Sequence, residues 1–296
     1  MLSILYGLSA ALGWGAGDFT GGLASRKTGA YRAVFYSEAI GIVFLFIVLG
    51  ISAESIPSLG ILLIAMVAGA IGTFGLILLY RAMTTGLMSV AAPVSALLAA
   101  SLPVLVGIFK EGVPKTLTVF GFGFALFAIW MISQSAGSVT DILAHLADLK
   151  LPLLAGIGFG SYFILMHEAT SSGATVWPMM ASRIGGTIFI AAYMLISRTS
   201  WKVEDTSAWL MLTLNGLLDI LGNVFFILAG QAGRLDVAAV LSSLFPGATV
   251  VLAWIFLKER LSRHQWIGIA AALIAIVLMS FDWQTFIQNE CCNLGG

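Results

Sequence analysis

Three polar residues recur at every fourth position within an otherwise apolar stretch of the chain. Asn215, Asp219 and Asn223 are spaced i, i+4, i+8, which places them in one row along one face of a helix. A row of amide, carboxyl and amide groups can bind the polar parts of a small molecule, or it can bond neighbouring helices to one another. Three such groups on one face favour the lining of a cavity.

Two opposite charges occupy matching places in two further apolar stretches. The segment SEAIG around Glu38 aligns with SRIGG around Arg183 when the two halves of the chain are superimposed. Placing such a group at the centre of a bilayer costs roughly 2.5–3.5 kcal/mol, so each is expected to face an interior or a cavity. Together they would form either a structural ion pair or a pair that contacts a substrate, and the residues leave both open.

A third carboxyl group, Asp18, lies four residues after Trp14, so that ring and carboxyl share a helix face. The predicted helices therefore contain three carboxyl groups, on Asp18, Glu38 and Asp219, but only one arginine away from their ends. Burial disfavours the charged form of a carboxyl group, so we expect at least one of the three to hold a proton. We assign proton exchange, or contact with a substrate ammonium group, to Asp219. This favours a cationic or zwitterionic ligand.

The predicted substrate-binding set combines these groups. It comprises Trp14, Asp18, Glu38, Arg183, Asn215, Asp219 and Asn223. Tyr80, Tyr162, Phe163 and Trp177 are aromatic residues that either floor the same cavity or lie at membrane interfaces.

The sequence contains no recognisable motif for metal binding, for catalysis or for a cofactor. The three histidines are scattered without metal-ligand spacing, and Cys291 and Cys292 are adjacent in a polar tail. No nucleophile triad and no Gly-rich phosphate loop occurs in the sequence, so we predict no catalytic residue, no metal and no cofactor. We do not expect an enzyme, and driving by ATP would require a separate subunit.

These polar groups stand in an apolar background. The chain has 296 residues, of which 59% are hydrophobic and 9% charged, whereas a soluble domain carries about 25% charged residues. The long runs without any charge are 55–80, 82–109, 116–140 and 237–257. Continuous apolar runs of this length predict membrane-spanning helices in a lipid bilayer. The balance of 14 basic and 14 acidic residues gives no reason to expect nucleic-acid binding.

Charged residues and Pro or Gly breaks predict ten helices in an all-α membrane protein. The helices are expected at 2–23, 31–51, 59–82, 87–109, 115–134, 152–169, 175–197, 207–230, 235–257 and 263–283. The longest polar break divides them into two sets of five. The expected units are a first repeat at 1–134, a connecting loop at 135–150, a second repeat at 151–283 and a polar tail at 284–296.

The two sets of five form an internal repeat. A shift of 148 residues places Lys110-Glu111 on Lys258-Glu259 at the ends of equivalent helices. An odd number of spans per repeat turns the second copy upside down in the membrane. Inverted repeats are a recurrent plan of secondary transporters, with the substrate near the midplane, and internal repetition also suits channels and scramblases.

The sequence text resembles a known family. The segments LGWGAGDFTGGLASRK at 12–27 and MMASRIGG at 179–186 and the block at 218–280 are similar to the EamA family of the drug/metabolite transporter (DMT) superfamily. The last block is the most specific, and the first copy is weaker because EGVPK replaces its Glu-Arg-Leu pattern. The resemblance implies ten helices and alternating access in a prokaryotic cytoplasmic membrane, with export of amino acids, amines, sugars or drugs.

Prolines inside two predicted helices suggest where the bundle could bend. We assign a hinge to Pro93, Pro246 and Gly247, since proline removes a helix hydrogen bond, although a static bend fits as well. Lys and Arg are distributed unequally between the predicted loops. Ten lie in the odd-numbered loops and three in the even-numbered loops. This bias places both termini outside, whereas the resemblance implies that they lie inside, so the orientation stays open.

The sequence therefore predicts a secondary active transporter for small polar or amphipathic metabolites, with coupling to protons as one option. The alternative is an uncoupled channel or a scramblase-like facilitator. An intramembrane enzyme using the carboxyl pair Asp18 and Asp219 is a third class, which the absence of a nucleophile or metal motif disfavours. We expect a monomer or a homodimer.

Overall fold

Every regular element in the described part of the chain is an α-helix. The computed structural model describes residues 2–52, 54–84, 88–133, 150–257 and 262–280. The predicted connecting loop at 135–150 and the tail at 284–296 lie outside these residues, apart from Lys150, which begins a helix.

The helices begin and end within a few residues of the predicted positions. The first half contains α1 (Leu2–Thr28), α2 (Ala30–Ile51), α3 (Leu59–Thr84), α4 (Met88–Glu111) and α5 (Thr116–Ser133). The second half contains α7 (Lys150–Thr170), α8 (Val176–Ile196), α9 (Ala208–Gln231), α10 (Leu235–Ser242), α11 (Phe245–Leu257) and α12 (Arg263–Ser280). The ninth predicted helix is thus two helices, α10 and α11, and the other nine correspond one to one.

Seven spans in the described residues are long and apolar enough to cross a membrane. They lie in α2, α3, α4, α7, α8 and α9 and in the stretch formed by α10 and α11. The apolar parts of α5 and α12 are shorter there, at Thr116–Met131 and Arg263–Leu278. α1 is long but rich in Gly, Ala and Ser, and about half of its residues are buried against other helices. The chain is a multi-pass membrane protein.

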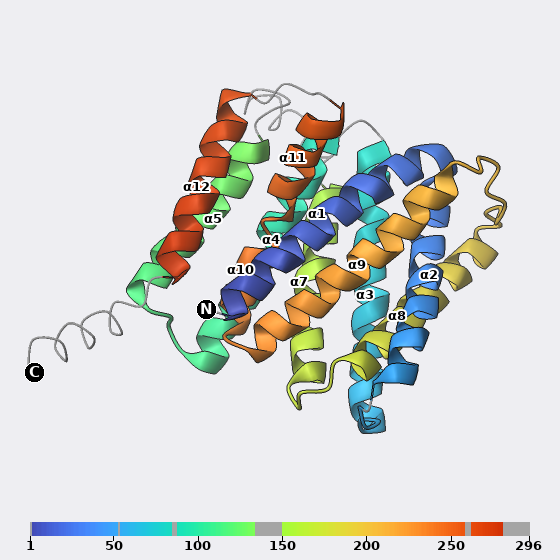
Figure 1. Cartoon of the computed structure of the whole chain (residues 1–296), viewed down its shortest axis with the longest axis horizontal. Helices are drawn as coiled ribbons and strands as arrows, with labels where there is room; N and C mark the ends of the chain where they lie inside the picture. Colours follow the sequence, from blue (N-terminus) through green and yellow to red (C-terminus); the bar gives the residue numbers. More distant parts are fainter. Residues whose placement is uncertain (1, 53, 85–87, 134–149, 258–261, 281–296) are drawn as a thin grey trace, which may run out of the picture.

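The helices pack across the two halves of the chain. Figure 1 shows α1 beside α9 as two long diagonal helices, with α3, α7 and α4 behind them and the pair of α5 and α12 at one side. Glycines lie where some of these helices are in close contact. A Cβ atom added to Gly13 would lie 2.8 Å from the backbone nitrogen of Gly222, and one on Gly156 would lie 2.6 Å from the carbonyl oxygen of Ser95. Small residues therefore let these helices approach closely.

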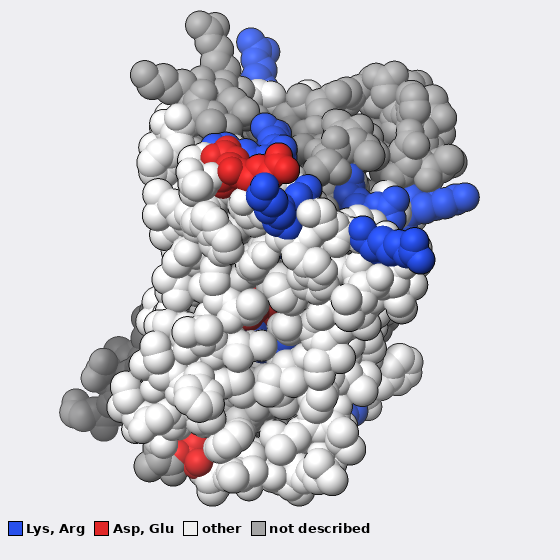
Figure 2. Space-filling view, turned by 90° about the vertical axis from the view of Figure 1, so that its right-hand side faces the viewer, with Lys and Arg blue, Asp and Glu red and all other residues white. Residues whose placement is uncertain are grey.

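Charged side chains gather at the ends of the bundle. Figure 2 shows Lys and Arg at one end of the molecule and a broad uncharged belt below them. At the end formed by the odd-numbered loops, Lys27 Nζ lies 3.3 Å from a carboxylate oxygen of Asp205. At the opposite end, Lys110 pairs with Glu168 at 2.7 Å. This distribution suits a protein whose middle faces hydrocarbon.

The ninth predicted helix is interrupted just before Pro246. α10 ends at Ser242 and α11 begins at Phe245, so the proline lies in the first turn of α11, where a missing N–H removes no hydrogen bond of that helix. In contrast, α4 continues through Pro93 and Pro103 without a break, and the Pro93 side chain lies outside the described part. The expected discontinuity therefore occurs in the second half, at Ser243 and Leu244. Whether Pro93, Pro246 and Gly247 act as hinges stays a prediction.

Candidate functional site

A cavity lies in the interior between helices of both halves. Six of the seven predicted substrate-binding residues line it, namely Trp14, Asp18, Glu38, Arg183, Asp219 and Asn223. They come from α1, α2, α8 and α9, and α3, α7 and α11 complete the walls. In Figure 2, red and blue atoms are visible at the bottom of a recess halfway along the uncharged belt. Charged groups are thus held deep within the apolar part of the molecule.

Arg183 links two carboxyl groups in this cavity. Its Nη1 atom lies 2.9 Å from Oε2 of Glu38, and its Nη2 atom donates a hydrogen bond to Oδ2 of Asp219. Thr73 donates a hydrogen bond of 3.1 Å to the other oxygen of Glu38. The predicted juxtaposition of Glu38 and Arg183 is present. The Arg183 and Glu38 side chains are 8% and 7% exposed, and that of Asp219 is 25% exposed, so Asp219 is the more accessible carboxyl of this pair.

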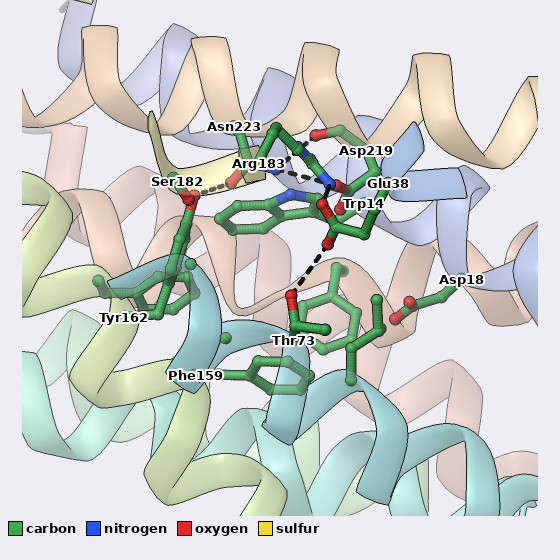
Figure 3. Close-up of a pocket in the computed structure, with 15 residues that line it drawn as sticks. Trp14, Asp18, Glu38, Thr73, Phe159, Tyr162, Ser182, Arg183, Asp219 and Asn223 are labelled. Carbon is green, nitrogen blue, oxygen red and sulfur yellow. Dashed lines mark hydrogen bonds and ion pairs between the residues drawn. The ribbon is translucent and has the colours of Figure 1, made fainter. Parts of the chain in front are cut away.

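A second set of hydrogen bonds extends this cluster along α9. The side-chain amide of Asn223 donates 3.1 Å to Oδ2 and 2.7 Å to the backbone carbonyl of Asp219. The Tyr162 hydroxyl on α7 donates to the Asn223 side-chain oxygen. In Figure 3 these groups form one connected chain on one side of the cavity. Helices α2, α7, α8 and α9 are joined through it.

Asn215 does not share the cavity with Asp219 and Asn223. Its amide donates 2.8 Å to the Ser37 hydroxyl on α2 and 3.4 Å to the Tyr80 hydroxyl on α3. The residue is 3% exposed and is absent from the cavity lining. The expectation that all three polar residues of the row line one cavity is therefore wrong for Asn215, which bonds neighbouring helices instead.

Trp14 and Asp18 lie on the same face of α1, as their spacing predicts. The indole of Trp14 stacks on Phe163 with a centroid distance of 5.2 Å and an interplanar angle of 11°. It also contacts Phe226 at 5.6 Å. In Figure 3 the Asp18 carboxyl group lies apart from the Arg183 cluster, below it and to its right. The cavity therefore has an ion-paired side and a separate carboxyl group.

Part of the lining was not identified from the sequence. Thr73, Phe159 and Ser182 line the cavity, and none has a spacing that distinguishes it from other residues of an apolar helix. Of the aromatic residues considered, Tyr162 and Phe163 are in the lining. Trp177 is not, because its indole N–H donates 3.1 Å to the backbone carbonyl of Glu54 between α2 and α3.

The chemistry of the lining limits what it can bind. Three carboxyl groups and one guanidinium give a net charge of −2 if all are ionised. Rings and an aliphatic side chain, from Trp14, Phe159, Phe163, Phe245 and Leu76, cover the rest. Within the described ranges, no group of three His, Cys, Asp or Glu side chains is arranged to hold a metal ion. A small molecule with apolar and polar parts fits this surface better than an anion does.

An all-helical, multi-pass membrane protein with a charged cavity between its helices is the class that this fold and cavity define. A family model described as the EamA-like transporter family matches residues 148–281. The match confirms the resemblance to the EamA family of the DMT superfamily, over the second half of the chain. This part of the chain is therefore similar to membrane transporters of the DMT type.

Two further similarities concern a sequence relative and the fold. A protein of Methanocaldococcus jannaschii (strain ATCC 43067), described as uncharacterized, is 29% identical over 95 residues, which are 32% of this chain and 69% of that protein. A solved crystal structure has the same fold, with a TM-score of 0.77 and 16% sequence identity, over 94% of this chain and 98% of the other.

Proposed function

We propose that the protein is a secondary transporter that carries small polar or amphipathic metabolites across the membrane by alternating access. The observation that carries the proposal is the cavity itself. Glu38 from the first half and Arg183 and Asp219 from the second half meet there, in the interior of the bundle. Ionisable groups at this depth are costly, and they commonly mark a substrate or ion pathway.

The packing pattern supports two inverted five-helix repeats. In these repeats α7 is the counterpart of α1, α8 of α2 and α9 of α3. α1 packs on α9, and in the same way α7 packs on α3. α3 packs on α8, and in the same way α9 packs on α2. α4 packs on α7 as α10 and α11 pack on α1, while α5 packs on its own counterpart α12. Such a plan places a binding site between the halves and lets them rock about it.

Polar contacts between the halves at both ends of the bundle suit alternating access. Lys27 pairs with Asp205 at one end, and Lys110 pairs with Glu168 at the other. These pairs are partly exposed, so each is weak and can open without a large penalty. The break between α10 and α11 lies beside the cavity residue Phe245 and supplies a place where the second half could flex.

We extend the proposal to the setting of the transport. The protein would lie in the cytoplasmic membrane of a prokaryotic cell, as a monomer or a homodimer, and it would act in export. A proton gradient is the coupling that the buried carboxyl groups support best.

The first experiment is a ligand panel on the detergent-purified protein. Amino acids, amines, sugars and nucleosides are added separately, and the melting temperature is followed, because a ligand of the folded state stabilises it by mass action. The matched variants are Asp219→Asn, in the cavity, and Glu204→Gln, in an exposed loop. A shift that is present in the wild type and Glu204→Gln and reduced in Asp219→Asn supports a binding site in the cavity.

Flux in proteoliposomes then tests the mechanism. A transporter gives saturable uptake that follows a gradient, whereas an uncoupled channel or facilitator gives uptake that rises without saturation at low concentration. Non-saturable flux that is unaffected by any imposed gradient would overturn the proposal in favour of the facilitator.

A further inference from the structure

Asp18 is the cavity carboxyl group without a partner. It is 8% exposed and belongs to the cavity lining. Figure 3 shows its carboxyl group directed into the cavity and joined to none of the residues drawn. Among the described residues, its side chain makes no hydrogen bond and no ion pair. A buried carboxylate in this condition is costly, so its charge requires either a cation or a proton.

The arginine of the cavity cannot supply that cation. Arg183 is already bound by Glu38 and Asp219, which between them carry one more negative charge than it neutralises. In Figure 3 no dashed line joins this cluster to Asp18, which lies below it and to its right. The position thus combines a free acidic group with an excess of negative charge nearby.

The neighbouring helices bring further ionisable groups, and none of them is a free cation. The groups that face Asp18 from α9, α2, α3, α7 and α8 are Asp219, Glu38, Tyr80, Tyr162 and Arg183. α11 contributes Phe245 to the lining, and Asp236 on α10 is paired with Arg234 at 2.8 Å. Among the described residues, the charges around Asp18 therefore oppose a second anion and attract a cation.

We propose that Asp18 is a proton and cation exchange site that selects organic cations as substrates. Asp18 holds a proton while the cavity lacks a cation. A protonated or quaternary amine then enters, the carboxyl proton leaves to water, and the carboxylate pairs with the ammonium group. One positive charge enters for one that leaves, and no covalent bond to carbon changes. This inference rests on the proposed function and names its substrate class.

The aromatic lining suits such a substrate. Trp14, Phe159 and Phe245 present rings to the same cavity, and ring faces attract cations that have lost their water. Leu76 is aliphatic and the Thr73 hydroxyl already donates to Glu38, so neither offers a free donor to an anion. The geometry thus assigns to Asp18 the role that the sequence alone gave to Asp219, whose carboxyl group is already engaged by Arg183.

Proton release on binding tests the proposal directly. The probe is benzyltrimethylammonium, which has a ring and a permanent charge but no proton to lose. It is added to the full-length protein in detergent, in weakly buffered solution with a pH indicator. The wild type should release on the order of one proton per cation bound, and its affinity should rise with pH as the competing proton is removed. Asp18→Asn should release none, should bind at least about tenfold more weakly and should lose the pH dependence.

Two variants guard against trivial outcomes. Glu204→Gln removes an exposed loop carboxyl group, and release should be unchanged. Asp18→Glu keeps a carboxyl group, so release should persist if this variant elutes as a monodisperse peak. Binding without release in the wild type overturns the exchange. Release that survives in Asp18→Asn but disappears in Asp219→Asn assigns the site to Asp219 and overturns the proposal.

Failure of this inference can be separated from failure of the proposed function. The uncharged isostere neopentylbenzene and a size series of quaternary amines are tested beside the probe. If no cation binds, or if the isostere binds as well as the cation, the organic-cation proposal is overturned. Saturable, gradient-dependent flux of any other metabolite in proteoliposomes would still support a transporter.

Discussion

The guanidinium group of Arg183 on α8 and the carboxylate of Glu38 on α2 form a 2.9 Å ion pair in the interior of the bundle. The two residues occupy the second helix of each half and come from aligned segments of the sequence. Because the side chains are less than a tenth exposed, their pairing joins the two halves where little water reaches. Asp219 shares the same arginine from α9.

Removal of Arg183 should therefore destabilise the protein strongly. Arg183→Met leaves two carboxyl groups close together without their cation, and breaking a buried pair from one side costs about 3–5 kcal/mol. We expect a lower free energy of unfolding, measured by denaturant titration in mixed micelles. The double variant Glu38→Gln/Arg183→Met should recover part of the loss, because one of the uncompensated charges is also removed. Equal stability of the single variant and the wild type would contradict the prediction.

Asn215 and Asn223 lie on one helix but should respond differently to substitution. Asn215 bonds Ser37 and Tyr80 outside the cavity, whereas Asn223 lines it. Asn215→Ala should lower the free energy of unfolding by about 1–3 kcal/mol and leave the affinity for a transported ligand nearly unchanged. Asn223→Ala should weaken that affinity. Ligand-induced shifts of the melting temperature separate the two effects. Weaker ligand binding by Asn215→Ala together with unchanged binding by Asn223→Ala would contradict this interpretation.

Most of the helices could be predicted from the sequence because each apolar run is bounded by charges or by Pro and Gly. The pairing of Glu38 with Arg183 followed from their matching places in the two halves. The exact break in the ninth helix did not follow, since Pro246 is harmless in a first helical turn and the chain breaks before it. The sequence shows where the proline is, but it does not show whether that residue lies in the first turn or in the interior of a helix.

The division of roles within the site depends on which helices are neighbours. Residues 215 and 223 are eight positions apart, about 12 Å along a helix, so a row of this length extends beyond one cavity. Likewise, nothing in the spacing of Asp18 and Asp219 says which of them reaches Arg183. That choice is made by the packing of α9 against α2. The free carboxyl group could be identified only after the contacts were known.

Glu54 makes a contact that stabilises the start of α8. Its carboxylate accepts hydrogen bonds from the backbone N–H groups of Thr175, Val176 and Trp177, at 2.9, 3.0 and 3.1 Å. These donors have no partner within the helix, and a negative charge is favourable at a helix N-terminus. Glu54→Ala should lower the free energy of unfolding by about 1–2 kcal/mol. The exposed Glu204→Ala serves as control in the same titration, and an equal effect of both substitutions would contradict the assigned role.

The seam between α1 and α9 should be sensitive to a single added methyl group. A Cβ atom on Gly13 would lie 2.8 Å from the backbone nitrogen of Gly222, and backbone cannot move aside as a flexible side chain can. Gly13→Ala should therefore cost about 1–3 kcal/mol despite the better helix propensity of alanine. Gly50, on α2, has open space around the same atom, so Gly50→Ala should be neutral or stabilise by up to about 1 kcal/mol. Melting temperatures of both variants in one detergent decide the matter, since a Gly13→Ala variant as stable as Gly50→Ala would show that the two helices are not in such close contact.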